Sequence, residues 1–336
     1  MRGVGLMDQV ARLPAHQRGE LFSETAARLG MTPAVVEKDF WVCWVLERVF
    51  REPELGRLLM FKGGTSLSKA YGLIERFSED VDLILDWRGL CGEDPLAVRS
   101  NSQQERLNKS IDEMALATIS QTLHGRISAA LAPLCQCAVD PGDAHNVQVR
   151  YPKTFPDVYL RPDITLEIAP LAAWLPYEPK TIRAYAAQAF PQVFAQPDFS
   201  IRVIRAERTF WEKATILHHE AHRPENSPQP AARYSRHYYD LARMAGAPVK
   251  DAALADLGLL AEVVAFKQRF YPRGWARYDL AVPGTLRLVP EGAVLRAVES
   301  DYRAMGNMIF GEAPTFSDMM VTLERLENDI NGRSDE

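Results

Sequence analysis

The apolar positions of the first fifty residues recur at intervals of three and four, which is the spacing of an amphipathic helix. The pattern predicts one helix over residues 9–29, followed by Gly30. Thr32 is a residue type that caps helices, and Pro33 suits a first helical position. A second helix is therefore expected to begin there and to continue to Phe50.

Short apolar runs and glycines replace this helical pattern after residue 57. Residues 58–61 (LLMF) are typical of a buried strand. Gly63 and Gly64 then separate this run from a short predicted helix at residues 65–71 (TSLSKAY). The order of these pieces predicts a tight strand-to-helix turn at the two glycines.

Two later segments alternate apolar with polar side chains, as half-buried strands do. Over residues 77–85 (FSEDVDLIL) the alternation places Asp80 and Asp82 on one strand face. A further strand is expected over residues 158–168. The polar face of that strand would carry Asp163, Thr165 and Glu167.

The remaining pattern suggests how the chain is divided. A long helix is expected over residues 102–131 and a strand over 146–151, whereas the pattern from Pro176 onward is mainly helical. We therefore predict an α+β protein. Residues 1–175 would form a mixed β-sheet flanked by helices with an N-terminal helical extension, and residues 176–336 a mainly helical C-terminal domain that completes the active-site cleft.

Composition limits the classes of function. The chain has 336 residues, 47% of them hydrophobic, and a net charge of -5. This charge argues against a protein that coats nucleic acid through bulk positive charge, but it permits a local basic patch. The chain starts without an apolar leader and has no run of about 18 apolar residues. We expect a cytoplasmic protein without membrane contact.

The paired aspartates suit metal-assisted phosphate chemistry. Two divalent ions about 4 Å apart stabilise charge on phosphate oxygens while a hydroxyl attacks. Mg²⁺ or Mn²⁺ takes oxygen ligands. Asp80 and Asp82 on one strand face provide such ligands. A third carboxylate from a neighbouring strand is expected to be Glu167 or Asp163.

The glycines add a second feature suited to phosphate. Gly63 and Gly64 allow the main chain to approach a phosphate group closely, and Thr65 and Ser66 add hydroxyl donors. Each piece alone is weak, because D-x-D strands and Gly-Gly turns are common. The order of strand, Gly-Gly-Thr-Ser, helix and D-x-D strand is much more specific.

These motifs resemble the AbiEii/AbiGii nucleotidyltransferase toxins, first associated with phage abortive infection. The resemblance is carried by residues 61–69 (FKGGTSLSK) and 77–83 (FSEDVDL) and implies a core like that of DNA polymerase β. The spacing to Asp80 is longer than in that polymerase. The similarity continues at residues 165–168 (TLEI), 207–213 (ERTFWEK) and 236–241 (RHYYDL).

The resemblance also implies roles for individual residues. Asp80 and Asp82 would bind metal, and Glu167 would occupy the third carboxylate position. Lys213 would contact nucleotide phosphate, and Asp240 would act in catalysis or position the lysine. Without the resemblance, Lys213 fits the solvated flank of a helix, and Asp240 fits an ion pair with Arg236 or Arg243.

The implied reaction transfers NMP from an NTP to an acceptor and releases pyrophosphate. In this family some members modify the 3′ end of tRNA and thereby block translation, and an AbiEi-type antitoxin encoded nearby opposes them. Three alternatives stay open from the residues alone. The acceptor could be a protein hydroxyl or a small molecule, the D-x-D could serve a glycosyltransferase, or the chain could be an inactive binding subunit.

An RNA acceptor requires a local basic surface on this acidic protein. The sequence suggests one in residues 202–243, where tyrosines that could stack on bases accompany several arginines. The predicted arginines are Arg202, Arg205, Arg208, Arg223, Arg233, Arg236 and Arg243, and the tyrosines are Tyr234, Tyr238 and Tyr239.

Overall fold

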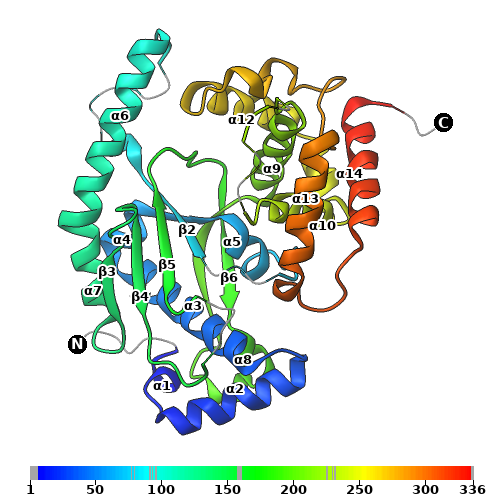
Figure 1. Cartoon of the computed structure of the whole chain (residues 1–336). Coiled ribbons are helices and arrows are strands. Elements are labelled where there is room, and N and C mark those ends of the chain that lie inside the picture. Colours follow the sequence, from blue (N-terminus) through cyan, green and yellow to red (C-terminus); the bar gives the residue numbers. More distant parts are fainter. Residues whose placement is uncertain are drawn as a thin grey trace. The chain divides into compact units, whose positions relative to one another are not determined.

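A computed structural model gives the fold (Figure 1). It forms two compact units. The N-terminal unit comprises Met1–Tyr71 and Phe77–Ile204, and the C-terminal unit comprises Gly72–Arg76 and Arg205–Glu336. The residues that the structure describes are 7–76, 78, 80–90, 92, 94, 97–156, 161–224, 226–228, 230 and 232–333.

The N-terminal unit is built on a seven-stranded mixed sheet with the order β3-β4-β5-β2-β1-β7-β6. β2 runs parallel to β5 and antiparallel to β1, and β1 runs parallel to β7. In this register Asp82 lies opposite both Lys62 and Glu167. The strands are β1 (Leu59–Lys62), β2 (Asp80–Leu85), β3 (Gln136–Val139), β4 (Asn146–Arg150), β5 (Ile164–Ala169), β6 (Tyr177–Arg183) and β7 (Asp198–Ile204).

The helix α3 (Pro33–Arg51) forms much of the core of this unit. It starts as the sequence predicts: the Thr32 hydroxyl accepts a hydrogen bond from Val35 N, and Pro33 takes the first helical position. Trp41 and Trp44 are almost fully buried on it. The other helices are α1 (Asp8–Ala11), α2 (Ala15–Leu29), α4 (Pro53–Leu58), α5 (Gly63–Lys69), α6 (Asn101–Thr118), α7 (His124–Leu131) and α8 (Tyr185–Ala189).

Of two long predicted helices, one is interrupted in the structure and the other is continuous. The predicted helix over residues 9–29 is divided into α1 and α2 at Pro14, because a proline inside a helix lacks the N–H donor and clashes with the preceding turn. The predicted helix over 102–131 does continue from α6 to α7, through a π-helical turn at Ile119–Leu123. The two predictions thus placed the helical residues correctly and missed one break.

The C-terminal unit is helical, as predicted. Its segment Gly72–Arg76 lies between α5 and β2 in the sequence, yet it pairs with this unit: Arg76 forms a β-bridge with Ile309, and Phe310 N donates to Glu75 O at 2.6 Å. The helices are α9 (Ala206–Ala221), α10 (Ser235–Ala245), α11 (Val249–Leu254), α12 (Leu257–Phe270), α13 (Gly292–Met305) and α14 (Phe316–Asn331). No helix in the described ranges is long and apolar enough to cross a membrane.

The α+β fold class is confirmed, but the prediction that the chain is mainly helical from Pro176 onward is wrong for residues 177–204. These residues form β6 and β7. β6 is an edge strand with mostly exposed or half-buried side chains, so it lacks an apolar pattern, and Pro179 is tolerated there. The N-terminal unit therefore extends beyond residue 175. Phe77, Glu79 and residues 157–160, which the predicted strands included, lie outside the described residues.

Candidate active site

The turn between β1 and α5 brings the main chain against an acidic side chain. Gly63 has φ +79°, a conformation that L side chains rarely adopt. A Cβ atom added to Gly63 would lie 1.9 Å from Asp82 Oδ2. Only glycine fits here, both because of the backbone angle and because the Asp82 carboxylate occupies the space of a side chain.

The two hydroxyls that follow the glycines hold the same turn. Thr65 Oγ1 donates to Asp80 O at 2.5 Å, and Ser66 Oγ donates to Gly63 O at 2.8 Å. Both side chains are buried. The hydroxyls that the sequence suggested as phosphate donors thus bond main-chain carbonyls in this structure. Thr65 fixes α5 to the start of β2, and Ser66 bonds within α5 itself.

Three carboxylates lie on one face of the sheet beside this turn. Asp80 and Asp82 are two residues apart on β2, and Glu167 stands opposite Asp82 on the parallel strand β5. All three are half-buried. Arg161 Nη1 donates to Asp80 Oδ1 at 3.2 Å. Asp163, the alternative third carboxylate, forms an ion pair with Arg150, in which Oδ1 lies 3.6 Å from Nε.

This donor set fits a divalent cation in its chemistry. Carboxylate oxygens are the ligands that Mg²⁺ and Mn²⁺ prefer, and half-buried positions leave access for water and phosphate. The Asp82 carboxylate also packs directly against the Gly63 main chain, where a Cβ atom would displace it. As the side chains stand, no three acidic, histidine or cysteine residues in the described part of the chain are grouped closely enough to hold an ion together.

The C-terminal unit contains a different acidic centre, in which Asp240 on α10 is completely buried. Arg76 binds both of its oxygens, with Nε 2.6 Å from Oδ1 and Nη2 2.7 Å from Oδ2. Lys213 Nζ lies 2.7 Å from Oδ2. Lys213 and Asp240, both predicted site residues, are therefore in direct contact. Arg236 and Arg243 are not the partners that bind its oxygens here, and Arg243 pairs with Glu75.

Burial and the neighbouring charges shift the pKa values of Asp240 and Lys213. Burial alone would raise the pKa of Asp240, but the adjacent Arg76 and Lys213 hold it well below its usual range. The pKa of Lys213 is lowered by burial and by the nearby Arg76, and the attraction of Asp240 only partly opposes this. Asp240 is thus an ionised carboxylate shared between two buried cations.

Comparison with known proteins identifies the chain. The family model described as "Nucleotidyl transferase AbiEii toxin, Type IV TA system" matches residues 44–325. The chain belongs to this family. It is a nucleotidyltransferase toxin of a toxin–antitoxin system, and the family implies an NTP substrate and an antitoxin partner. The resemblance stated from the sequence is confirmed.

Two solved structures are similar to this AbiEii-family toxin at low sequence identity. One is MenT4, a nucleotidyltransferase toxin from Mycobacterium tuberculosis, with 17% identity and a TM-score of 0.39 over 94% of this chain and 99% of that chain. The other is JHP933 from Helicobacter pylori, with 15% identity and a TM-score of 0.34 over 86% of this chain and 94% of that chain. No curated protein matches.

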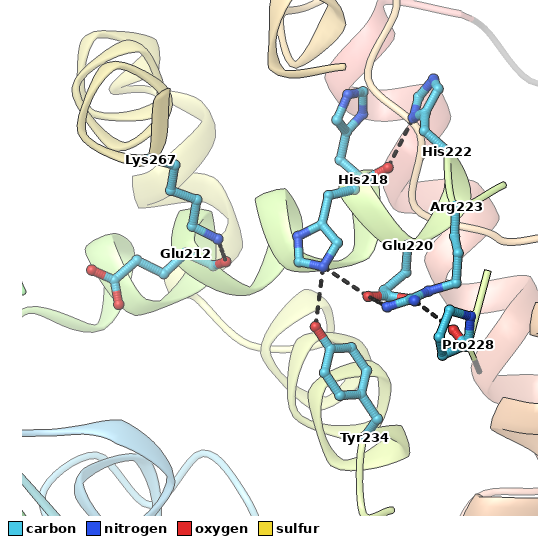
Figure 2. A network of polar contacts seen from close by, with 9 residues as sticks. Glu212, His218, Glu220, His222, Arg223, Pro228, Tyr234 and Lys267 are labelled. Carbon is cyan, nitrogen blue, oxygen red and sulfur yellow. Dashed lines mark hydrogen bonds and ion pairs between the residues drawn. The ribbon is translucent and has the colours of Figure 1, made fainter. Parts of the chain in front are cut away.

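The RNA-contacting patch suggested by the sequence of this toxin is wrong for several of its members. Tyr238 and Tyr239 are buried at 0% and 1% exposure, so they cannot stack on a base. Arg208 is also buried, beside Glu212, whereas Arg223 is only half-buried and binds Glu220 (Figure 2). Helical spacing places Tyr238, Tyr239 and Arg208 in the interior of the C-terminal unit.

Arg76 is the site residue that sequence reasoning missed. It lies in the short segment between the glycine motif and the D-x-D strand, where it has the appearance of a loop arginine. Its partner Asp240 is 164 positions away in the sequence. No local pattern records such a pairing, and only its position next to the D-x-D strand could have drawn attention to it.

Proposed function

We propose that this AbiEii-family toxin transfers NMP from an NTP to the 3′ end of tRNA and uses Mg²⁺ or Mn²⁺. The observation that carries the metal-dependent part is the set of three carboxylates on one sheet face, with Gly63 packed against one of them. The tRNA acceptor rests on what the family resemblance implies. The products are a nucleotide-extended RNA and pyrophosphate.

In the N-terminal unit, Asp80, Asp82 and Glu167 would hold the metal. A bound divalent ion stabilises negative charge on the phosphate oxygens as the RNA hydroxyl displaces pyrophosphate. We assign the third position to Glu167, because it lies opposite Asp82 on the neighbouring strand β5, whereas Asp163 precedes that strand. Gly63 and Gly64 would let the triphosphate approach the main chain, and Thr65 and Ser66 would keep the turn in that shape.

In the C-terminal unit, Lys213 would bind a phosphate of the nucleotide. Its ammonium group is directed by Asp240, which Arg76 fixes from the other side. Because Asp240 already neutralises the buried Lys213 ammonium, the lysine can donate a hydrogen bond to a phosphate without being a buried charge that lacks a counter-charge. Asp240 and Arg76 are positioning residues in this proposal.

The experiment is to incubate the purified protein with each labelled NTP in turn, together with Mg²⁺ and total tRNA. We expect label on RNA with at least one NTP, and no label with Asp82→Ala. Absence of label on any RNA, together with unchanged growth when the protein is overproduced, would contradict the proposal. Label on protein bands or on a small molecule instead of RNA would identify one of the other acceptors.

A further inference from the structure

A short segment at the end of α12 combines basic and aromatic side chains. Residues 266–278 have the sequence FKQRFYPRGWARY, with four basic residues, five aromatic residues and no acidic one. This is unusual in a chain whose net charge is -5. The segment lies within the C-terminal unit, where α12 leads into the short helices Gly274–Ala276 and Tyr278–Leu280 (Figure 1).

The aromatic residues of this segment have two different environments. Phe270 and Tyr278 are buried and anchor it to the unit. Tyr271 is 45% exposed, which is high for a large aromatic side chain, and Trp275 is half-buried. Arg273 is exposed and lies beside Trp275, whereas Arg269 is half-buried. The segment therefore presents aromatic rings and guanidinium groups to solvent together.

Two guanidinium groups lie near the Trp275 ring. The Cζ atoms of Arg223 and Arg273 lie 4.8 Å and 5.8 Å from the centre of its ring. Arg223 is itself fixed, because it binds both oxygens of Glu220 and donates to Pro228 O at 2.7 Å (Figure 2). Trp275 and Arg223 thus form a cation–π pair whose geometry is fixed before any ligand binds.

The Tyr271 ring lies next to a pair of packed phenylalanine rings. The ring centres of Tyr271 and Phe266 are 6.5 Å apart, and those of Phe266 and Phe270 are 4.4 Å apart. An exposed ring on a packed aromatic base loses little conformational freedom when another ring stacks on it. We call Tyr271, Arg273 and Trp275, with Arg223, the aromatic-basic surface.

We propose that the aromatic-basic surface binds the single-stranded end of the acceptor RNA. Unpaired bases stack on exposed aromatic faces irrespective of sequence, and adjacent arginines neutralise the phosphates. Base-paired RNA hides its base faces, so this chemistry favours a single strand over a duplex. The proposal rests on the proposed function and moves the RNA contact away from the buried residues Tyr238 and Tyr239.

The test measures RNA binding directly, without NTP. Fluorescence anisotropy would follow the full-length protein binding to a labelled single-stranded RNA ending in CCA, and to a duplex of equal length. We expect Tyr271→Ala to weaken single-strand binding about tenfold, in line with the loss of one stacked base. Arg273→Glu should weaken it as well and reduce its salt dependence.

A matched control is Arg303→Glu on α13, whose side chain is 75% exposed and which changes the net charge by the same amount. It should bind like the wild type. Equal RNA binding by wild type, Tyr271→Ala and Arg273→Glu would overturn the proposal. Duplex binding as tight as single-strand binding would also overturn it, as would equally tight binding of the wild type to an acidic protein in place of RNA.

Transfer kinetics separate this inference from the proposed function. If the surface holds RNA, Tyr271→Ala should raise the KM for RNA and leave the KM for NTP and the kcat at saturating RNA unchanged. If the wild type transfers nucleotide to RNA and the variants show the same KM for RNA, the RNA-binding role of the surface is contradicted and the proposed function is not. A wild type that labels no RNA at all would contradict the proposed function.

Discussion

The two units of this toxin hold their acidic side chains in opposite ways. In the N-terminal unit Asp80, Asp82 and Glu167 are half-buried on one face of the sheet. In the C-terminal unit Asp240 is fully buried, and Arg76 and Lys213 take up both of its oxygens. The first arrangement leaves its carboxylates partly exposed to solvent, whereas the second encloses a carboxylate together with two cations.

The difference separates two tasks that aspartate can perform. A half-buried carboxylate can exchange water for a cation at small cost. A buried carboxylate between two cations cannot leave them, because uncompensated buried charge is strongly destabilising. The N-terminal group therefore suits metal binding, whereas Asp240 suits the positioning of Lys213.

Replacement of Asp82 should have the largest effect. Asp82→Ala removes a proposed metal ligand, and metal-ion stabilisation is worth several kcal/mol, so transfer should fall by roughly three to four orders of magnitude. The fold should survive, because Asp82 is half-buried and does not belong to the apolar core. Label transfer and a thermal melt would measure the two effects.

The neighbouring carboxylates provide the control for that experiment. Glu167→Ala should lose most of its activity, whereas Asp163→Ala should keep most of it, since Asp163 precedes β5 and does not lie opposite Asp82. The reverse result would move the third metal ligand to Asp163. Full activity of Asp82→Ala would remove the metal site from the N-terminal unit.

Replacement of Asp240 should affect stability as well as activity. Asp240→Asn leaves Arg76 and Lys213 buried without a counter-charge, so the free energy of unfolding should fall by about 3–5 kcal/mol in urea titrations. The control is Asp329→Asn, which removes an exposed ion pair with Lys250 and should cost less than about 1 kcal/mol.

A triple variant separates the contribution of this buried centre to stability from its contribution to nucleotide transfer. Arg76→Met, Lys213→Met and Asp240→Leu together remove all three charges and should restore much of the stability, as apolar replacements of buried ion pairs do. The variant should still transfer no nucleotide. Recovered transfer would show that the centre serves the fold alone.

Two glycines with the same backbone requirement sharpen the picture of the N-terminal site. Gly63→Ala forces a Cβ atom onto the Asp82 carboxylate and should lower transfer about a hundredfold, the size of effect expected from a displaced catalytic group. Gly30→Ala has a similar positive φ but open space around it. Both should lose about 1–2 kcal/mol of stability, and only Gly63→Ala should lose activity.

The smallest predicted effect concerns His218, a buried group of the C-terminal unit. Burial lowers the pKa of His218 to about 4. Its Nε2 lies 2.9 Å from Arg277 O, and its Nδ1 accepts a hydrogen bond from Arg287 N at 3.0 Å, so the neutral ring fits and a second proton does not. The unfolded chain binds a proton near pH 6.5, before the folded chain does.

Stability from His218 should therefore be fully present above about pH 6.5 and decline as the pH falls towards 4. Between about pH 7 and pH 5 the loss should be about 2 kcal/mol. His218→Gln can still donate and accept but cannot titrate, and urea titrations of this variant should show a flatter pH dependence. An equal slope in both proteins would rule out His218 as the cause.

Local patterns predicted the parts of the site that are continuous in sequence. The alternation around Asp80 and Asp82 is visible in the sequence because a strand with one buried face must alternate. The turn at Gly63 was predicted for a related reason, since glycine is the residue that permits a positive φ. The close approach of Gly63 to Asp82 was not predicted, because it depends on the pairing of β1 with β2.

Residues with little local signal were misjudged. The edge strand β6 has few buried side chains, and its neighbour β7 was assigned with it to a helical region. Tyr238 and Tyr239 look like surface tyrosines in a polar stretch, yet they are buried. Helical spacing gives the face of a side chain relative to its own helix, but not which face another helix will cover.

The sequence alone determined the family, the α+β class and the D-x-D strand behind a glycine turn, because each depends on residues close together in the chain. The tertiary structure alone decided that Glu167 lies opposite Asp82 and that Arg76 joins Lys213 at Asp240. These contacts join residues far apart in sequence. Their stability depends on strand register and on the burial of charge, which only the folded chain defines.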